Sequence, residues 1–86
     1  MKLKEGFVLR DIAGETVVLP SGDNLDLSKM ISLNETAKFL WERLEQGATE
    51  EELVAALLAE YDVEPTRAQN SVRRFLETME HHGFLI

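Results

Sequence analysis

Residues 33–47, LNETAKFLWERLEQG, decide how this chain folds, because the spacing of hydrophobic residues changes there from that of a strand to that of a helix. The i, i+4, i+7 and i+8 spacing of one helix face is occupied by Leu33, Ala37, Leu40, Trp41 and Leu44. Asn34 can accept hydrogen bonds from the first amides of this helix, and Ser32 with Glu35 offers a competing capping box. Gly47 is a typical residue after a helix end. We therefore expect a strand to lead directly into a helix.

Upstream of this point the sequence predicts three strands, at residues 6–12, 15–20 and 26–32. Val, Ile, Leu and Phe are enriched in these segments and alternate in part with polar residues. Ala13 and Gly14 suit a short hairpin turn, and the turn formers at residues 20–24 suit a longer loop. Strands joined in this way form an antiparallel meander.

The third predicted strand has two irregular positions. Its apolar side carries Leu25, Leu27, Ile31 and Leu33, and its polar side carries Asp26, Ser28, Met30 and Ser32. Lys29 interrupts the apolar side. Met30 interrupts the polar side, where it is either an exposed, adaptable contact residue or packed under the third helix. A sheet of so few strands leaves at least one edge uncovered, onto which a peptide can add as an antiparallel strand beside a groove.

Two further helices are predicted downstream of Gly47. Thr49 and Glu52 have the spacing of a capping box, and they open a helix that stops near Asp62. Its predicted buried stripe is Leu53, Leu57, Leu58 and Tyr61. Pro65 suits the first turn of a third helix. The buried face of that helix is predicted to carry Ala68, Val72, Phe75, Leu76 and Met79.

Gly83 ends the third helix, and residues 84–86 are expected to return as a short extended tail. The order of elements predicts an α+β fold, with an N-terminal three-stranded antiparallel sheet followed by three helices. No internal repeat or linker divides the chain, so residues 1–86 are expected to form a single winged helix-turn-helix-like domain.

Composition excludes several classes of protein. The 86 residues contain no cysteine, which rules out disulfides, thiolate metal sites and a cysteine nucleophile. The longest apolar runs are only a few residues, so we expect no membrane segment and a cytoplasmic location. The net charge is −7, and residues 34–64 hold nine acidic against two basic residues. Such a balance disfavours nucleic acid as a partner, because phosphates are bound by clustered Lys and Arg.

Catalytic and metal sites are also not expected. His81 and His82 are adjacent, so on a helix they point about 100° apart and cannot chelate as an i, i+4 pair. The glutamates at residues 50–52 are explained by a favourable interaction with a helix N-terminus. Trp41 is expected to be a core residue. We therefore predict a non-enzymatic protein with no catalytic residue, no metal and no cofactor.

Residues 31–86, ISLNETAKFLWERLEQGATEEELVAALLAEYDVEPTRAQNSVRRFLETMEHHGFLI, resemble PqqD-type proteins. The shared pattern is a Leu-Asn-Glu-Thr helix start, a Gly-x-Thr-Glu-Glu-Glu-Leu second helix, and a third helix that ends in a Gly-hydrophobic tail. The preceding GFVLRDIAGETVVLP, residues 6–20, matches as well. The resemblance implies a recognition element for ribosomally synthesised and post-translationally modified peptides. Such a module binds the leader of a precursor peptide and presents it to a modifying enzyme, for example a radical-SAM enzyme.

The resemblance also implies where the leader adds, namely beside the third strand in the cleft against the third helix. Carried onto this chain, the peptide-binding residues are Leu27, Ser28, Lys29, Met30, Ile31, Arg67, Ser71, Arg74 and Phe75. The position of the acidic residues agrees with this, since it leaves the sheet and the third helix available to an acidic leader.

Two other functions remain open from the sequence. A winged-helix regulator would bind DNA through Arg67, Arg73 and Arg74, although the same helix region holds Glu64, Glu77 and Glu80. A structural domain would pair its free sheet edge with a second copy. We expect a monomer or a weak dimer.

Overall fold

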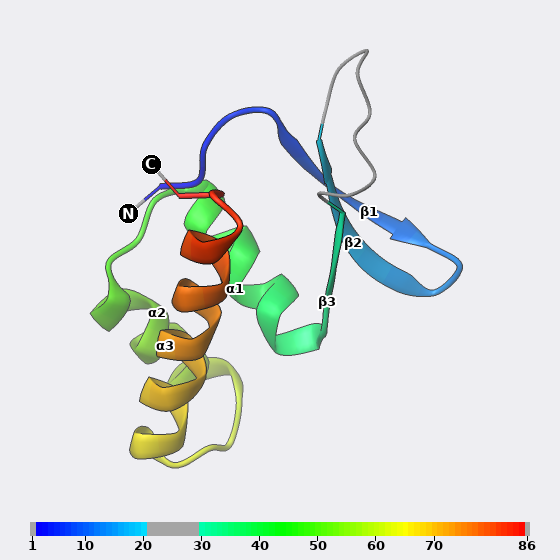
Figure 1. The fold of residues 1–86 in the computed structure, drawn as a ribbon. Coiled ribbons are helices and arrows are strands. Elements are labelled where there is room, and N and C mark those ends of the chain that lie inside the picture. The colour runs from blue at the N-terminus through cyan, green and yellow to red at the C-terminus, as the bar shows by residue number, and fades with distance from the viewer. Residues whose placement is uncertain (1, 21–29, 86) are drawn as a thin grey trace.

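Three strands come first along the chain and three helices follow, in a computed structural model that describes residues 2–20 and 30–85 (Figure 1). The strands are β1 (Phe7–Ile12), β2 (Glu15–Pro20) and β3 (Ile31–Leu33). The helices are α1 (Glu35–Glu45), α2 (Glu50–Glu60) and α3 (Pro65–His81). The sheet has the order β1-β2-β3 with antiparallel neighbours. The predicted α+β class and winged-helix-like arrangement are confirmed.

The hairpin between β1 and β2 turns in two residues. Ala13 has a φ of 53° and Gly14 a φ of 84°, as a two-residue turn of the primed type requires. Ile12 is paired with Glu15 directly beside the turn, and this fixes the register of the remaining β1–β2 pairs. Of the third predicted strand, residues 26–29 lie outside the described residues, and the observed β3 ends at Leu33 rather than at Ser32.

The change from strand to helix occurs at Asn34, as expected. The Asn34 side chain accepts a hydrogen bond from the Ala37 amide at 2.8 Å, so the structure settles the choice of cap in favour of Asn34. The second cap is also confirmed, because the Thr49 hydroxyl and the Glu52 carboxylate exchange hydrogen bonds with each other's backbone amides.

The core lies between the three helices and includes Val18 and Leu33 of the sheet. Trp41 is 2% exposed, which confirms it as a core residue. The fully buried residues come from every helix and from β2, and include Val18, Leu40, Leu44, Leu53, Ala68 and Val72. The prediction for Leu58 was wrong, since this side chain is 39% exposed. It is adjacent to the buried Leu57, which turns it about 100° away from the line along which α2 packs.

The C-terminal tail ties the two ends of the described chain together (Figure 1). Gly83, with a φ of 73°, ends α3, and Leu85 then forms an antiparallel bridge with Leu3. Phe84 is 1% exposed, and its ring lies 4.5 Å from Phe7 and 5.7 Å from Trp41 between centroids. The tail therefore anchors the start of β1 and the end of α3 to the same core.

No helix within the described residues is both long and apolar enough to cross a membrane. Across residues 2–20 and 30–85, no three His, Asp or Glu side chains gather in a way that could hold a metal ion.

Candidate functional site

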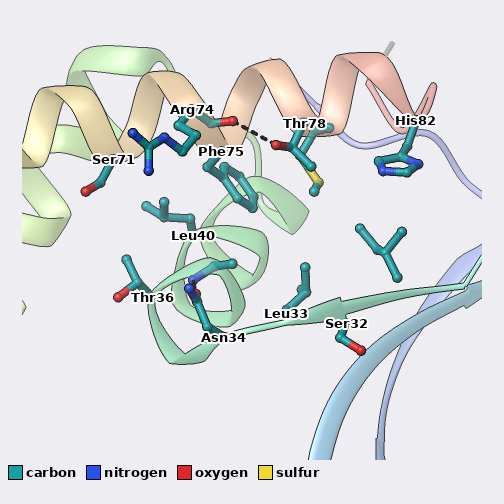
Figure 2. A pocket seen from close by; sticks show the side chains of 13 residues that line it. Ser32, Leu33, Asn34, Thr36, Leu40, Ser71, Arg74, Phe75, Thr78 and His82 are labelled. Atoms are coloured by element: carbon teal, nitrogen blue, oxygen red, sulfur yellow. Dashed lines mark hydrogen bonds between the residues drawn. The ribbon is translucent and has the colours of Figure 1, made fainter.

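A groove of about 430 Å³ lies between β3 and the start of α1 on one side and α3 on the other (Figure 2). Its lining comes from three elements that are distant in sequence. The residues that line it are Ile31, Ser32, Leu33, Asn34, Thr36, Ala37, Leu40, Ser71, Arg74, Phe75, Thr78, Met79 and His82.

The inner surface of the groove is apolar. Leu33, Leu40, Phe75 and Met79 line it and are all buried. The Leu33 side chain points toward α3, whereas that of Ser32 points away from it (Figure 2). This alternation follows from the two-residue period of a strand, and it agrees with the predicted apolar side at Leu33, whereas Leu25 and Leu27 lie outside the described residues. The groove thus offers an apolar surface beside a strand.

Polar side chains of α3 form the opposite rim. Ser71, Arg74, Thr78 and His82 recur at spacings of three and four residues, which places them on one side of the helix. The Thr78 hydroxyl donates to the Arg74 carbonyl at 3.0 Å. The His82 ring stacks on Phe84 at 5.6 Å between centroids and 20° between planes, so the anchored tail supports it.

The charge in the groove has one sign. Among the described residues that line it, Arg74 carries a positive charge and none is acidic. The chain as a whole has a net charge of −7, with its acidic residues concentrated in residues 34–64. Within that range, burial raises the pKa of the Tyr61 hydroxyl, and the carboxylates of Glu35 and Glu60 raise it further. The groove is therefore a basic depression on an acidic protein.

Within the described residues, β3 pairs with β2 and with no other strand, so no described strand covers its outer edge. The two residues that flank a two-residue turn form a hydrogen-bonded pair, and every second pair along the two strands does the same. The backbone N–H and C=O groups of Glu15 and Val17 therefore point toward β1. The N–H and C=O groups of Thr16 and Val18 point the other way, toward β3, where Thr16 is paired with Leu33 and Val18 with Ile31. Ser32 lies opposite Val17, and its N–H and C=O therefore turn toward the open edge.

The structure brings together four of the predicted binding residues. Ile31, Ser71, Arg74 and Phe75 line the groove. Met30 is 42% exposed, which agrees with the prediction of an exposed residue rather than one packed under the third helix. It does not line the groove.

Arg67, in the first turn of α3, is exposed and also lies outside the groove lining. Leu27, Ser28 and Lys29 lie outside the described residues. A role of these residues in peptide binding stays a prediction.

The sequence analysis missed other groove residues. Thr78, Met79 and His82 follow Arg74 and Phe75 at helical spacing, so the period of α3 could have indicated them. Leu33 and Leu40 were assigned to the core alone, and they are both core and groove residues. Asn34 and Thr36 had no signal for the groove beyond the helix start that contains them.

Arg73 does not belong to the groove. Its Nε lies 3.8 Å from Oε1 of Glu50 at the start of α2, while the neighbouring Arg74 lines the groove. The two adjacent arginines of the alternative DNA-binding reading thus diverge across the helix.

Fold and groove together define a small α+β module with an open strand edge beside an apolar cleft. The chain belongs to the PqqD family, since the family model described as coenzyme PQQ synthesis protein D matches residues 15–85. The predicted resemblance to this family is confirmed.

Two solved structures are similar over nearly the whole chain. One, described as TbiB1 in complex with the TbiA(beta) leader peptide, is 29% identical, covers 99% of this chain and 94% of its own, and has a TM-score of 0.78. The other is a lasso peptide synthetase B1 complexed with the leader peptide. It is 24% identical, covers 96% of this chain and 93% of its own, has a TM-score of 0.73, and supports the fold alone. No sequence among the curated proteins matches this chain.

Proposed function

We propose that this protein binds the leader region of a ribosomally made precursor peptide as an added strand on β3 and presents it to a modifying enzyme. The observation that carries the proposal is the apolar groove between the open edge of β3 and α3. The similar TbiB1 structure contains a leader peptide, and this supports the same class of ligand here.

Strand addition explains both affinity and selectivity. The outward N–H and C=O of Ser32 give the peptide backbone a partner, and alternate peptide side chains can enter the apolar groove. A dissociation constant in the micromolar range corresponds to about −8 kcal/mol. Such an affinity suits a module that captures its ligand and then hands it over.

The proposed role is tethering rather than catalysis. Holding the leader raises the effective concentration of the attached core peptide near the modifying enzyme, with no cofactor in the module itself. A radical-SAM enzyme is one partner of the kind that the family implies. Both partners would meet in the cytoplasm, where the precursor is made.

A selection from a displayed library of random 12-residue peptides tests this proposal. The test variant is Thr78→Trp, whose large side chain fills the groove from an exposed position of α3. The matched control is Glu77→Trp, which adds the same side chain at the neighbouring exposed position outside the groove. We expect peptides that bind the wild type and Glu77→Trp but not Thr78→Trp. Peptides retained equally by all three proteins, or no enriched peptide at all, would contradict the proposal.

Sedimentation of the free protein over a dilution series completes the test. A monomer leaves the β3 edge available to a peptide. A dimer that dissociates when the selected peptide is added also supports binding at this edge. A dimer that stays intact and excludes the peptide argues instead for a sheet edge used in self-association.

A further inference from the structure

We infer that the groove selects peptides with two carboxylates four residues apart that flank an apolar residue. This inference rests on the proposed function and specifies its ligand. It arises from the placement of Arg74 and His82 at opposite ends of the groove, with Phe75 between them (Figure 2).

The spacing follows from the geometry of the helix. His82 caps the C-terminus of α3 and follows Arg74 by eight positions, which at 1.5 Å per residue is about 12 Å along the helix axis. An extended peptide rises about 3.3 Å per residue, so it covers this length in about four residues. Residues i and i+4 of a strand point to the same side. One strand can therefore present a carboxylate to each of these two side chains.

The residue midway between the two carboxylates points to the same side of the peptide. It would face the middle of the groove, where Phe75 of α3 lies opposite Leu33 (Figure 2), and Met79 also lines the groove. These three side chains are buried and offer only apolar contacts at that depth. The expected pattern in the peptide is therefore acidic-x-apolar-x-acidic.

The chemistry of the two end residues favours carboxylates. Arg74 is exposed and presents a guanidinium, which matches the planar geometry of a carboxylate. His82 has a ring N–H donor in either protonation state, and its stacking on Phe84 limits the positions of the ring. No described residue that lines the groove is acidic, so nothing in the lining repels the peptide carboxylates. A basic peptide would meet only like charge there and would also leave the Arg74 side chain unpaired.

The sequences recovered in the peptide selection give the first test. We expect Asp or Glu to be enriched at two positions four apart around an apolar residue. Peptides that depend on the open groove but lack this pattern would overturn the inference and leave the proposed function standing. If no peptide depends on the groove, both fail together.

Titration of matched peptides gives the second test. One selected peptide is labelled with fluorescein and compared with versions in which both acidic residues are replaced by the corresponding amides or by Lys. Because an exposed ion pair is worth up to about 1 kcal/mol, each lost carboxylate should weaken binding by up to about fivefold. Equal affinity of the three peptides would overturn the inference.

Variants of the protein then assign each carboxylate to its partner. Arg74→Glu should reverse the preference between acidic residue and Lys at one peptide position and leave the other unchanged, and His82→Leu should weaken discrimination only at the second. Arg73→Gln removes the same charge from the adjacent residue, which pairs with Glu50, and should leave the preference for acidic residues unchanged at both peptide positions. A reversal by Arg74→Glu at both positions or at neither would contradict the assignment.

Discussion

The sheet has two outer strands, β1 and β3, and of the described residues in these two strands those of β3 line the groove. β3 joins α1 directly and faces α3 across the apolar cleft, whereas no residue of β1 contributes to the groove lining. The second half of β1, Arg10 to Ile12, is exposed. Both strands present backbone donors and acceptors, so the comparison separates what an open edge supplies from what a flanking helix adds. An edge alone pairs with any extended chain, and the groove gives β3 its selectivity.

The largest effect is expected from Phe84→Ala, because this ring connects both the start of β1 and the end of the groove to the core. It contacts Phe7 at the start of β1, Trp41 in α1 and the groove residue His82. Loss of a buried Phe side chain costs about 3–5 kcal/mol. Chemical denaturation should show this loss. A change below about 1 kcal/mol would mean that the tail does not anchor β1 and the groove to one core.

The two edges can be compared directly by removing one outward amide from each. The pairing pattern places the amide of Ser32 on the open side of β3 and that of Asp11 on the open side of β1. Ser32→Pro deletes a donor and should weaken peptide binding by about tenfold or more, whereas Asp11→Pro should leave it unchanged. Fluorescence polarisation with a selected peptide measures both.

Two controls make this comparison interpretable. Ser32→Ala and Asp11→Ala keep the amides and separate side-chain effects, which matters because the Asp11 carboxylate accepts a hydrogen bond from Thr16 at 2.9 Å. Circular dichroism and thermal melting must show that both proline variants are folded. Equal binding by the two folded proline variants would remove the distinction between the edges.

A smaller effect is expected at the helix caps. Asn34 caps α1 at the end of β3, and Thr49 caps α2 away from the groove. Either residue changed to Ala should cost about 1 kcal/mol of unfolding free energy. Only Asn34→Ala should also weaken peptide binding, because this residue lines the groove. Parallel loss of binding in Thr49→Ala would show that general stability, rather than the β3–α1 junction, controls the site.

The smallest effect is expected at the ion pair between β1 and α1. Nζ of Lys38 in α1 lies 4.0 Å from Oδ1 of Asp11 in β1, and their side chains are 38% and 70% exposed. Water and salt screen such a pair, so Lys38→Ala should change the free energy of unfolding by less than about 0.5 kcal/mol. A larger loss, measured by urea denaturation, would show that this contact helps to hold β1 in place.

The sequence was informative where local chemistry determines the structure. The period change at Leu33, the Asn34 cap and the Thr49 capping box predicted where α1 and α2 begin. The sequence predicted less well which side chains are buried where two segments pack against each other. Leu58 fits the helical stripe by spacing, but Leu53 and Leu57 are the buried residues of α2, and Leu58 stays exposed.

The same limit applies to the groove. The resemblance assigned Arg74 but not Arg73 to the peptide site, and only the tertiary packing shows that Arg73 lies beside Glu50 while Arg74 lines the groove. The sequence analysis considered His82 only as a metal ligand with His81, because its position in the groove depends on the tail that returns through Phe84.

Amide hydrogen exchange followed by NMR tests the central claim most directly. The amides of Ser32 and Asp11 are compared in the free protein and with a saturating selected 12-residue peptide. If the peptide adds as a strand on β3, exchange at Ser32 slows strongly while exchange at Asp11 is unchanged. Protection at Asp11, or no change at Ser32 in the saturated complex, would contradict this account.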